Sequence, residues 1–173
     1  MPFDPFKFVQ GLEKTSPGFS RKLTMFFLGF MSPFNGHLKT DMQEWTDNKA
    51  IITLMRTRGV RNHVAAIHAG AQFTLGETCA GLVIIRNFPF SHYRPLMSDV
   101  SVTYSKQARS DITGECILSP EAILKAHDAI GRGEIPVIEL TTNISGDVNG
   151  QREIISVVKT VWQVKPWKQV RSK

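Results

Sequence analysis

The spacing of apolar residues changes along the chain, and each spacing predicts a different element. Residues 3–31 have helical periodicity, and the sequence Ser-Pro-Gly at residues 16–18 divides them into two short helices. Alternating apolar and polar positions predict strands over residues 37–45 and 49–56, and the polar residues 46–48 between them suit a hairpin turn. Two helices and a β-hairpin are therefore expected in the first third of the chain.

Residues 66–85 carry apolar side chains on every side of a 3.6-residue helical wheel. Such a helix is buried all round, so a sheet is expected to wrap it. The same segment contains a carboxylate, Glu77, and carboxylates are seldom buried without a partner. Glu77 either pairs with one of Arg56, Arg58 and Arg61, or meets solvent through a gap, or takes part in chemistry.

The second half of the chain alternates between apolar and polar residues in four segments. The predicted strands cover residues 96–105, 111–119, 135–145 and 152–164. The first two are expected to pair with each other, and the last two to form a hairpin across the loop at residues 146–150. A helix over residues 119–133 separates the two pairs, because Ser119 suits its N-cap and Pro120 its first position.

These elements predict an α+β fold in which an antiparallel sheet of about six strands wraps one long central helix, with extra helices at the N-terminus. This layout resembles the hotdog fold. The length of 173 residues is enough for one domain with a hydrophobic core. We expect a single hotdog domain over residues 1–173, with residues 1–36 as a helical lead-in and residues 165–173 as a basic tail.

Composition and charge limit the cellular location and the kinds of partner that are expected for the protein. With 42% hydrophobic and 21% charged residues, extended disorder is not expected. The two cysteines, Cys79 and Cys116, form no CxxC pair, and the chain shows no export signal or membrane span, so a cytoplasmic location is expected. The net charge of +6 favours binding to an anionic partner, which could be nucleic acid, a membrane surface or a phosphorylated small molecule. No nucleic-acid-binding motif accompanies the charge, so nucleic acid is not expected as a partner.

The segment "NHVAAIHAGAQFTLGE" carries the most specific motif of the chain. It resembles the signature N-x5-H-G-G-x2-F-x-L-A-D/E of the hotdog acyl-CoA thioesterases. Asn62, His68 and Glu77 fall in register with the signature, as does its Phe-x-Leu pair. Ala69 stands where the family has its first glycine, and Gly70 is kept. The N-terminal helices and the helix before the fifth strand make the whole chain resemble the bacterial group called DUF4442.

Glu77 and the start of its helix supply two groups that thioester hydrolysis requires. Free N–H groups at a helix N-terminus stabilise an oxyanion, and Ala69, with Gly70 as the alternative, is the candidate donor. Burial in an apolar helix raises the pKa of Glu77 and suits it to act as a general base or nucleophile. Gly70 and Glu77 are about 10 Å apart along the helix, so one chain's donor and carboxylate cannot both contact one carbonyl.

The resemblance implies that the protein hydrolyses an acyl-CoA or a related acyl thioester as a homodimer, which could assemble further into a tetramer. Two antiparallel central helices would place the helix start of one chain beside the carboxylate of the other. The family pattern implies that Asn62 orients the nucleophile or water. It also implies that His68 holds the helix start by side-chain hydrogen bonding and contacts the thioester. No cofactor is implied.

Two other functions remain open: a hotdog dehydratase or hydratase, and a non-catalytic hotdog dimer that binds acyl thioesters. The register of Asn62, His68 and Glu77 favours hydrolysis over hydration. The alanine at position 69 is the feature that favours an inactive relative.

Three basic residues are candidates for binding the phosphates of CoA near the rim of the sheet. They are Arg58, Arg61 and Lys106, chosen because they flank the motif or end a neighbouring strand. A metal site is not expected, because His63 and His68 are five residues apart and no second carboxylate is well placed.

Overall fold

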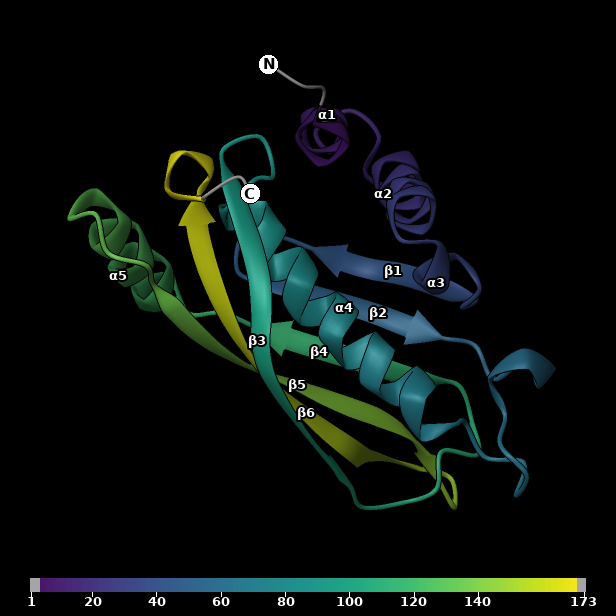
Figure 1. Ribbon diagram of the computed structural model, residues 1–173. Helices are drawn as coiled ribbons and strands as arrows, with labels where there is room; N and C mark the ends of the chain where they lie inside the picture. Colours follow the sequence, from purple (N-terminus) through teal and green to yellow (C-terminus); the bar gives the residue numbers. More distant parts are fainter. Residues whose placement is uncertain (1–3, 171–173) are drawn as a thin grey trace.

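The computed structural model describes residues 4–170, in which six strands form one sheet around a long helix (Figure 1). The strands are β1 (Thr40–Trp45), β2 (Lys49–Leu54), β3 (Tyr93–Tyr104), β4 (Ile112–Ile117), β5 (Val137–Val148) and β6 (Gln151–Pro166). All neighbours are antiparallel, and the order across the sheet is β1-β2-β4-β5-β6-β3. The helix α4 (Ala69–Asn87) packs on one face of this sheet. This confirms the predicted α+β hotdog layout.

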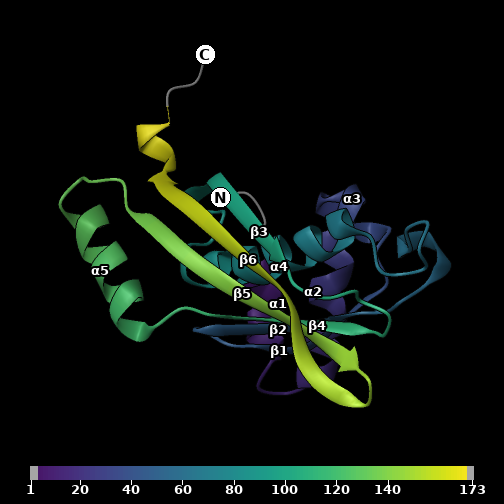
Figure 2. The same cartoon turned by 90° about the horizontal axis from the view of Figure 1, so that it is seen from below.

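The two longest strands, β5 and β6, form the hairpin that the sequence predicts, and Figure 2 shows them running side by side. Their connection is shorter than the expected loop at residues 146–150, because the turn consists of Asn149 and Gly150 alone. Both residues have positive φ, 55° and 82°. An Asn-Gly pair adopts this left-handed conformation at low cost and matches the twist of a two-residue hairpin.

One predicted strand pairing is wrong. β3 lies at the edge of the sheet beside β6, whereas β4 lies between β2 and β5. Alternation shows which side chains of a strand are buried, but it does not identify the neighbouring strand. In this central position β4 contacts α4, where the Cys79 thiol donates to the Gly114 carbonyl over 3.5 Å. β3 also begins earlier than expected and includes Pro95, which an edge strand tolerates because it needs fewer backbone donors.

The helix α4 starts three residues later than the sequence predicts. Residue Ile67 is extended, because it forms a β-bridge with Arg61 and donates its N–H to the Ala108 carbonyl over 2.8 Å. The prediction that this helix is buried all round is also wrong for a single chain. Phe73 and Glu77, one helical turn apart, are only half-buried, while the opposite side of α4 is fully covered by the sheet.

Close approach of α4 to the sheet depends on Gly76. A Cβ atom at this position would lie 2.6 Å from the Cβ of the buried Val158 on β6. The Gly76 carbonyl also accepts a hydrogen bond of 2.9 Å from the Thr142 hydroxyl on β5. The absence of a side chain therefore sets the distance between the helix and the sheet.

Gly76→Ala is expected to lower the free energy of unfolding by about 1–3 kcal/mol, because the added methyl group forces the helix away from Val158. Gly81→Ala is the matched control in the same helix, since its Cβ would lie 3.4 Å from Trp162, an ordinary contact. This control should leave stability unchanged or raise it by up to about 1 kcal/mol through helix propensity. Urea unfolding of both variants checks the difference, and equal effects would contradict the packing argument.

Helices cover the two ends of the molecule. α1 (Pro5–Leu12), α2 (Pro17–Met31) and α3 (Pro33–Gly36) gather beside β1, and α5 (Pro120–Gly131) stands at the opposite end (Figure 1). The predicted division of the N-terminal helices at residues 16–18 is confirmed, whereas the short α3 was not predicted. The Ser119 hydroxyl caps α5 by accepting the Ala122 N–H over 3.2 Å, as the sequence predicts.

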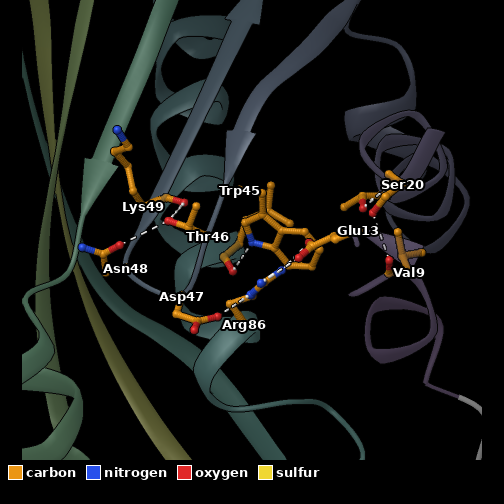
Figure 3. Close-up of polar contacts among 11 residues, drawn as sticks. Val9, Glu13, Ser20, Trp45, Thr46, Asp47, Asn48, Lys49 and Arg86 are labelled. Carbon is orange, nitrogen blue, oxygen red and sulfur yellow. Dashed lines mark hydrogen bonds and ion pairs between the residues drawn. The ribbon is translucent and has the colours of Figure 1, made fainter. Parts of the chain in front are cut away.

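Arg86 near the end of α4 holds the N-terminal helices against the sheet (Figure 3). Its guanidinium donates to the Glu13 carboxylate at the end of α1, and to Asp47 in the β1–β2 turn over 2.8 Å. It also lies 4.9 Å from the centre of the Trp45 ring, whose Nε1–H donates to the Leu82 carbonyl over 3.0 Å. The cluster links α1, the hairpin and α4, and so positions α2 beside the half-buried face of α4.

Candidate active site

The loop before α4 is organised by Asn62. Its backbone N–H donates to the Ala66 carbonyl over 2.8 Å, and its side-chain oxygen accepts the N–H groups of Val64 and Ala66, each over 3.1 Å. Ala65 in this loop has a positive φ of 60°, and its carbonyl accepts two hydrogen bonds from the Arg56 guanidinium. The Asn62 oxygen is thus engaged in the loop, and its amide NH₂ is the group left to act on a ligand.

His68 is the N-cap of α4. Its Nδ1 accepts the Gly70 N–H over 3.0 Å, so the ring proton of the neutral imidazole lies on Nε2. Within residues 4–170, no group accepts the N–H of Ala69. Of the two predicted oxyanion donors, Ala69 is therefore available and Gly70 is engaged by the cap. The Tyr104 hydroxyl donates to the Ala69 carbonyl over 3.0 Å and borders the same helix start.

Glu77 lies in the middle of α4 on the half-buried face. Burial raises the pKa of its carboxyl above the ordinary value, because an apolar environment disfavours the charged form. Among residues 4–170, no Lys, Arg or His lies within 4.0 Å of its carboxylate. A salt bridge of Glu77 to Arg56, Arg58 or Arg61 therefore does not explain its burial in the single chain. An uncompensated carboxylate with a raised pKa is a feature of functional sites.

Glu77 lines a cavity of about 180 Å³ between α4, the α2–α3 segment and the β3 and β6 side of the sheet. Apolar side chains form much of its wall, including Leu28, Ile85, Phe90 and Trp162. A cavity with such walls has room for an apolar group, whose end would lie beside the carboxylate. A larger groove of about 430 Å³ lies between α5 and β5, and none of the predicted site residues lines it.

Three polar side chains of this cavity were not predicted from the sequence. Asn35 on α3 donates to the Ser32 hydroxyl over 3.2 Å and accepts from the Thr78 hydroxyl over 3.4 Å. Asn35 and Glu77 are far apart in the sequence and share no motif, so only the packing of α3 on α4 brings them together. Among these three residues, only Thr78 could have been linked to the site from the sequence, because it directly follows Glu77.

The helix start and the carboxylate are too far apart to act together within one chain. Ala69 and Glu77 are separated by eight residues of continuous helix, which corresponds to about 12 Å along the axis. The residues predicted for the two halves of the site therefore lie apart in the single chain.

The predicted phosphate-binding residues are all exposed near the start of α4. Arg58 and Arg61 lie in the turn that leads into the loop of Asn62. Lys106 follows β3 and forms an ion pair with Glu153, which partly neutralises it. No carboxylate in the described part of the chain pairs with either arginine. The arginines are therefore the better placed of the three to meet a free phosphate.

Neither metal-binding nor membrane-spanning features were found in the described residues. No group of three or more His, Cys, Asp or Glu side chains between residues 4 and 170 could hold a metal ion. None of the helices in that range is both long and apolar enough to cross a bilayer.

A six-stranded antiparallel sheet around one central helix, with the candidate residues on that helix, defines a hotdog protein. Residues 20–158 match the family described as "Domain of unknown function (DUF4442)", and the chain belongs to this family. The resemblance stated from the sequence is therefore confirmed. No match was found among curated protein sequences.

Solved structures share this fold at low sequence identity. One is a protein of unknown function from Pseudomonas aeruginosa, described as a probable thioesterase. It is 19% identical, with a TM-score of 0.74 over 84% of this chain and 95% of that chain. Another, a protein of unknown function from Chlorobaculum tepidum, is 11% identical. Its TM-score is 0.70 over 94% of this chain and 96% of that chain. A thioesterase family protein from Silicibacter pomeroyi is 10% identical. Its TM-score is 0.63 over 82% of this chain and 96% of that chain. At these identities, the likeness establishes the fold alone.

Proposed function

We propose that the protein hydrolyses an acyl thioester, such as an acyl-CoA, with Glu77 as the reacting carboxylate. The observation that carries this proposal is the position of Glu77, which has no ion-pair partner in the described chain, has a raised pKa and lines an apolar cavity. A half-buried carboxylate without a cation is costly to the fold, and a catalytic role would account for its presence.

As a general base, the ionised Glu77 accepts a proton from water while the water oxygen attacks the thioester carbonyl carbon. The carbonyl oxygen becomes an oxyanion, which the free N–H of Ala69 and the positive end of the α4 dipole stabilise. The C–S bond then breaks, the thiolate takes up the proton, and the products are a carboxylic acid and a thiol. As a nucleophile, Glu77 would attack the carbonyl itself, and the C–S bond would break to give an acyl anhydride of Glu77 and a thiolate. Water would then hydrolyse the anhydride to the carboxylic acid and the Glu77 carboxylate, and the thiolate would take up the proton that is released.

The distance of about 12 Å between Ala69 and Glu77 supports a site that a second chain completes. We infer a homodimer in which two α4 helices run antiparallel, with the half-buried face of Phe73 and Glu77 turned to the partner. The helix start of one chain then lies beside Glu77 of the other. In this arrangement the Asn62 amide orients the water, and Nε2–H of His68 faces the thioester.

Incubation with a panel of acyl-CoA esters of different chain lengths, with detection of the released thiol, tests the proposal. Release above the uncatalysed rate is the expected result. Acyl-CoA binding without thiol release would instead indicate a non-catalytic binding protein. Conversion of an enoyl-CoA to a hydroxyacyl-CoA without thiol release would indicate a hydratase.

We further predict that Arg58 and Arg61 bind the phosphates of CoA. The double variant Arg58→Ala/Arg61→Ala should raise KM for acyl-CoA roughly tenfold at low salt, because two exposed cations are lost, and the effect should shrink at high salt. Lys125→Ala on α5 is the matched control and should change little. Acyl thioesters of a small thiol without phosphates should show no difference between the variant and the wild type. An equal loss with both substrates would contradict a role for these arginines in phosphate binding.

A further inference from the structure

α2 presents a stripe of aromatic side chains to the outside of the molecule. Phe19, Phe26 and Phe30 are 57%, 65% and 77% exposed, and their spacing places them on one face of the helix. The half-buried Leu23 lies on the same face, and Phe34 on α3, 68% exposed, extends the stripe. A contiguous apolar patch of this kind is rare on the surface of a soluble monomer and marks an interaction site.

The stripe is not required to hold α2 in place. The opposite face of the helix carries the contacts with the rest of the fold: Ser20 donates to the Val9 carbonyl over 2.9 Å, Thr24 is fully buried, and Leu28 lines the Glu77 cavity. Figure 1 shows α1 and α2 at the outer side of β1, away from α5. The aromatic side chains therefore point outward from a helix that is already anchored by its inner face.

The surroundings of the stripe are positively charged. Lys7, Lys14 and Lys22 are exposed on α1, the following turn and α2. The two acidic residues of this region do not pair with these lysines, because Asp4 caps α1 and Glu13 is paired with Arg86. An exposed aromatic stripe, with one unpaired lysine on the same helix and two more on or next to the adjacent α1, is the pattern of a helix that lies in the interface of an anionic lipid bilayer.

We propose that α2 and α3 dock the protein on the surface of an anionic lipid bilayer. The phenylalanine rings enter the boundary between headgroups and acyl chains, and the lysines lie beside lipid phosphates. Charge distinguishes this partner from a second copy of the chain, because a symmetric contact through the stripe would bring Lys22 and its neighbours close to their own equivalents.

Docking in this orientation brings the candidate site close to the lipid. The Glu77 cavity lies on the inner side of α2, about one helix diameter, or 10 Å, from the aromatic stripe. An acyl chain partitioned into the bilayer would thus be near the cavity wall formed by Leu28. The docking itself does not depend on the reaction at Glu77, and it is measured without any substrate.

Flotation with lipid vesicles tests the proposal on the full chain. At low salt, the protein should bind vesicles that contain both phosphatidylcholine and phosphatidylglycerol. Its binding to vesicles of phosphatidylcholine alone should be weaker by at least about tenfold. Phe26→Ser/Phe30→Ser should weaken the partition by at least about tenfold through lost apolar burial. Lys14→Glu/Lys22→Glu should weaken it to a similar degree, and raised salt should have the same effect.

Leu124→Ser and Lys125→Glu are the matched controls, because both residues are exposed on α5 at the other end of the molecule. These control variants should bind the anionic vesicles as strongly as the wild-type protein does. Circular dichroism checks folding, and the lysine pair provides the test if the phenylalanine pair fails to fold. Absence of wild-type binding to anionic vesicles, or equal losses in the α5 variants, would overturn the proposal. So would a phenylalanine variant that lowers the mass in light scattering, because the stripe would then join two copies of the chain.

Discussion

Glu77→Gln is expected to lower kcat/KM for thioester hydrolysis by a factor of about a hundred to ten thousand. The amide has almost the shape of the carboxylate, but it cannot accept a proton from water or attack a carbonyl. Thiol release from the best acyl-CoA of the panel measures the loss. For the wild type, kcat/KM should rise with pH through the raised pKa of Glu77, because the ionised form is the active one.

Stability provides the control for this variant. The pKa of Glu77 is raised above 4.5 in the folded chain, so its neutral form is the one that the fold favours. The stability linked to this group is fully present below about pH 4.5, the ordinary pKa of an unfolded glutamate. It is lost as the pH rises through the folded pKa. At pH 7, Glu77→Gln should therefore unfold at the same or a higher urea concentration than the wild type, and the difference should vanish at low pH.

The two measurements together separate the possible roles of Glu77. Loss of activity with retained or increased stability supports a catalytic carboxylate that is costly to the fold. A variant that unfolds more easily at pH 7 would show that the carboxylate has a structural partner. Full activity in the variant would remove Glu77 from the mechanism.

Local patterns in the sequence were sufficient to predict the main elements of the fold. The apolar composition of α4 predicted a central helix, and the alternation along β5 and β6 predicted a long hairpin. Ser119 and Pro120 marked the start of α5 correctly. These features are encoded within a few residues of one another, so each can be recognised without knowledge of the rest of the chain.

Features that depend on distant residues were not predictable in the same way. Alternation in β3 did not reveal that its neighbour is β6, because the partner is set by packing across the whole sheet. Asn35 and Tyr104 border the candidate site through contacts between separate elements. The choice between Ala69 and Gly70 as the free donor depends on which N–H the His68 ring accepts, and that is decided by side-chain geometry.

Mixing two inactive variants should restore activity if each site is shared between two chains. Asn62→Ala disables the half-site beside the start of α4, and Glu77→Ala disables the carboxylate half. Each homodimer should be nearly inactive. In a heterodimer, one site carries both defects and the other carries neither, so it should recover about half of the activity of a wild-type dimer.

A reciprocal mixture distinguishes shared sites from sites completed within one chain. When the double variant Asn62→Ala/Glu77→Ala is mixed with the wild type, a heterodimer with shared sites has one defect in each site and should be inactive. If each chain completed its own site, this heterodimer would keep half of the activity, and the mixture of single variants would recover none. The two mixtures thus predict opposite results for the two arrangements. Shared sites are expected, because the same helix holds the Ala69 donor and the Glu77 carboxylate about 12 Å apart.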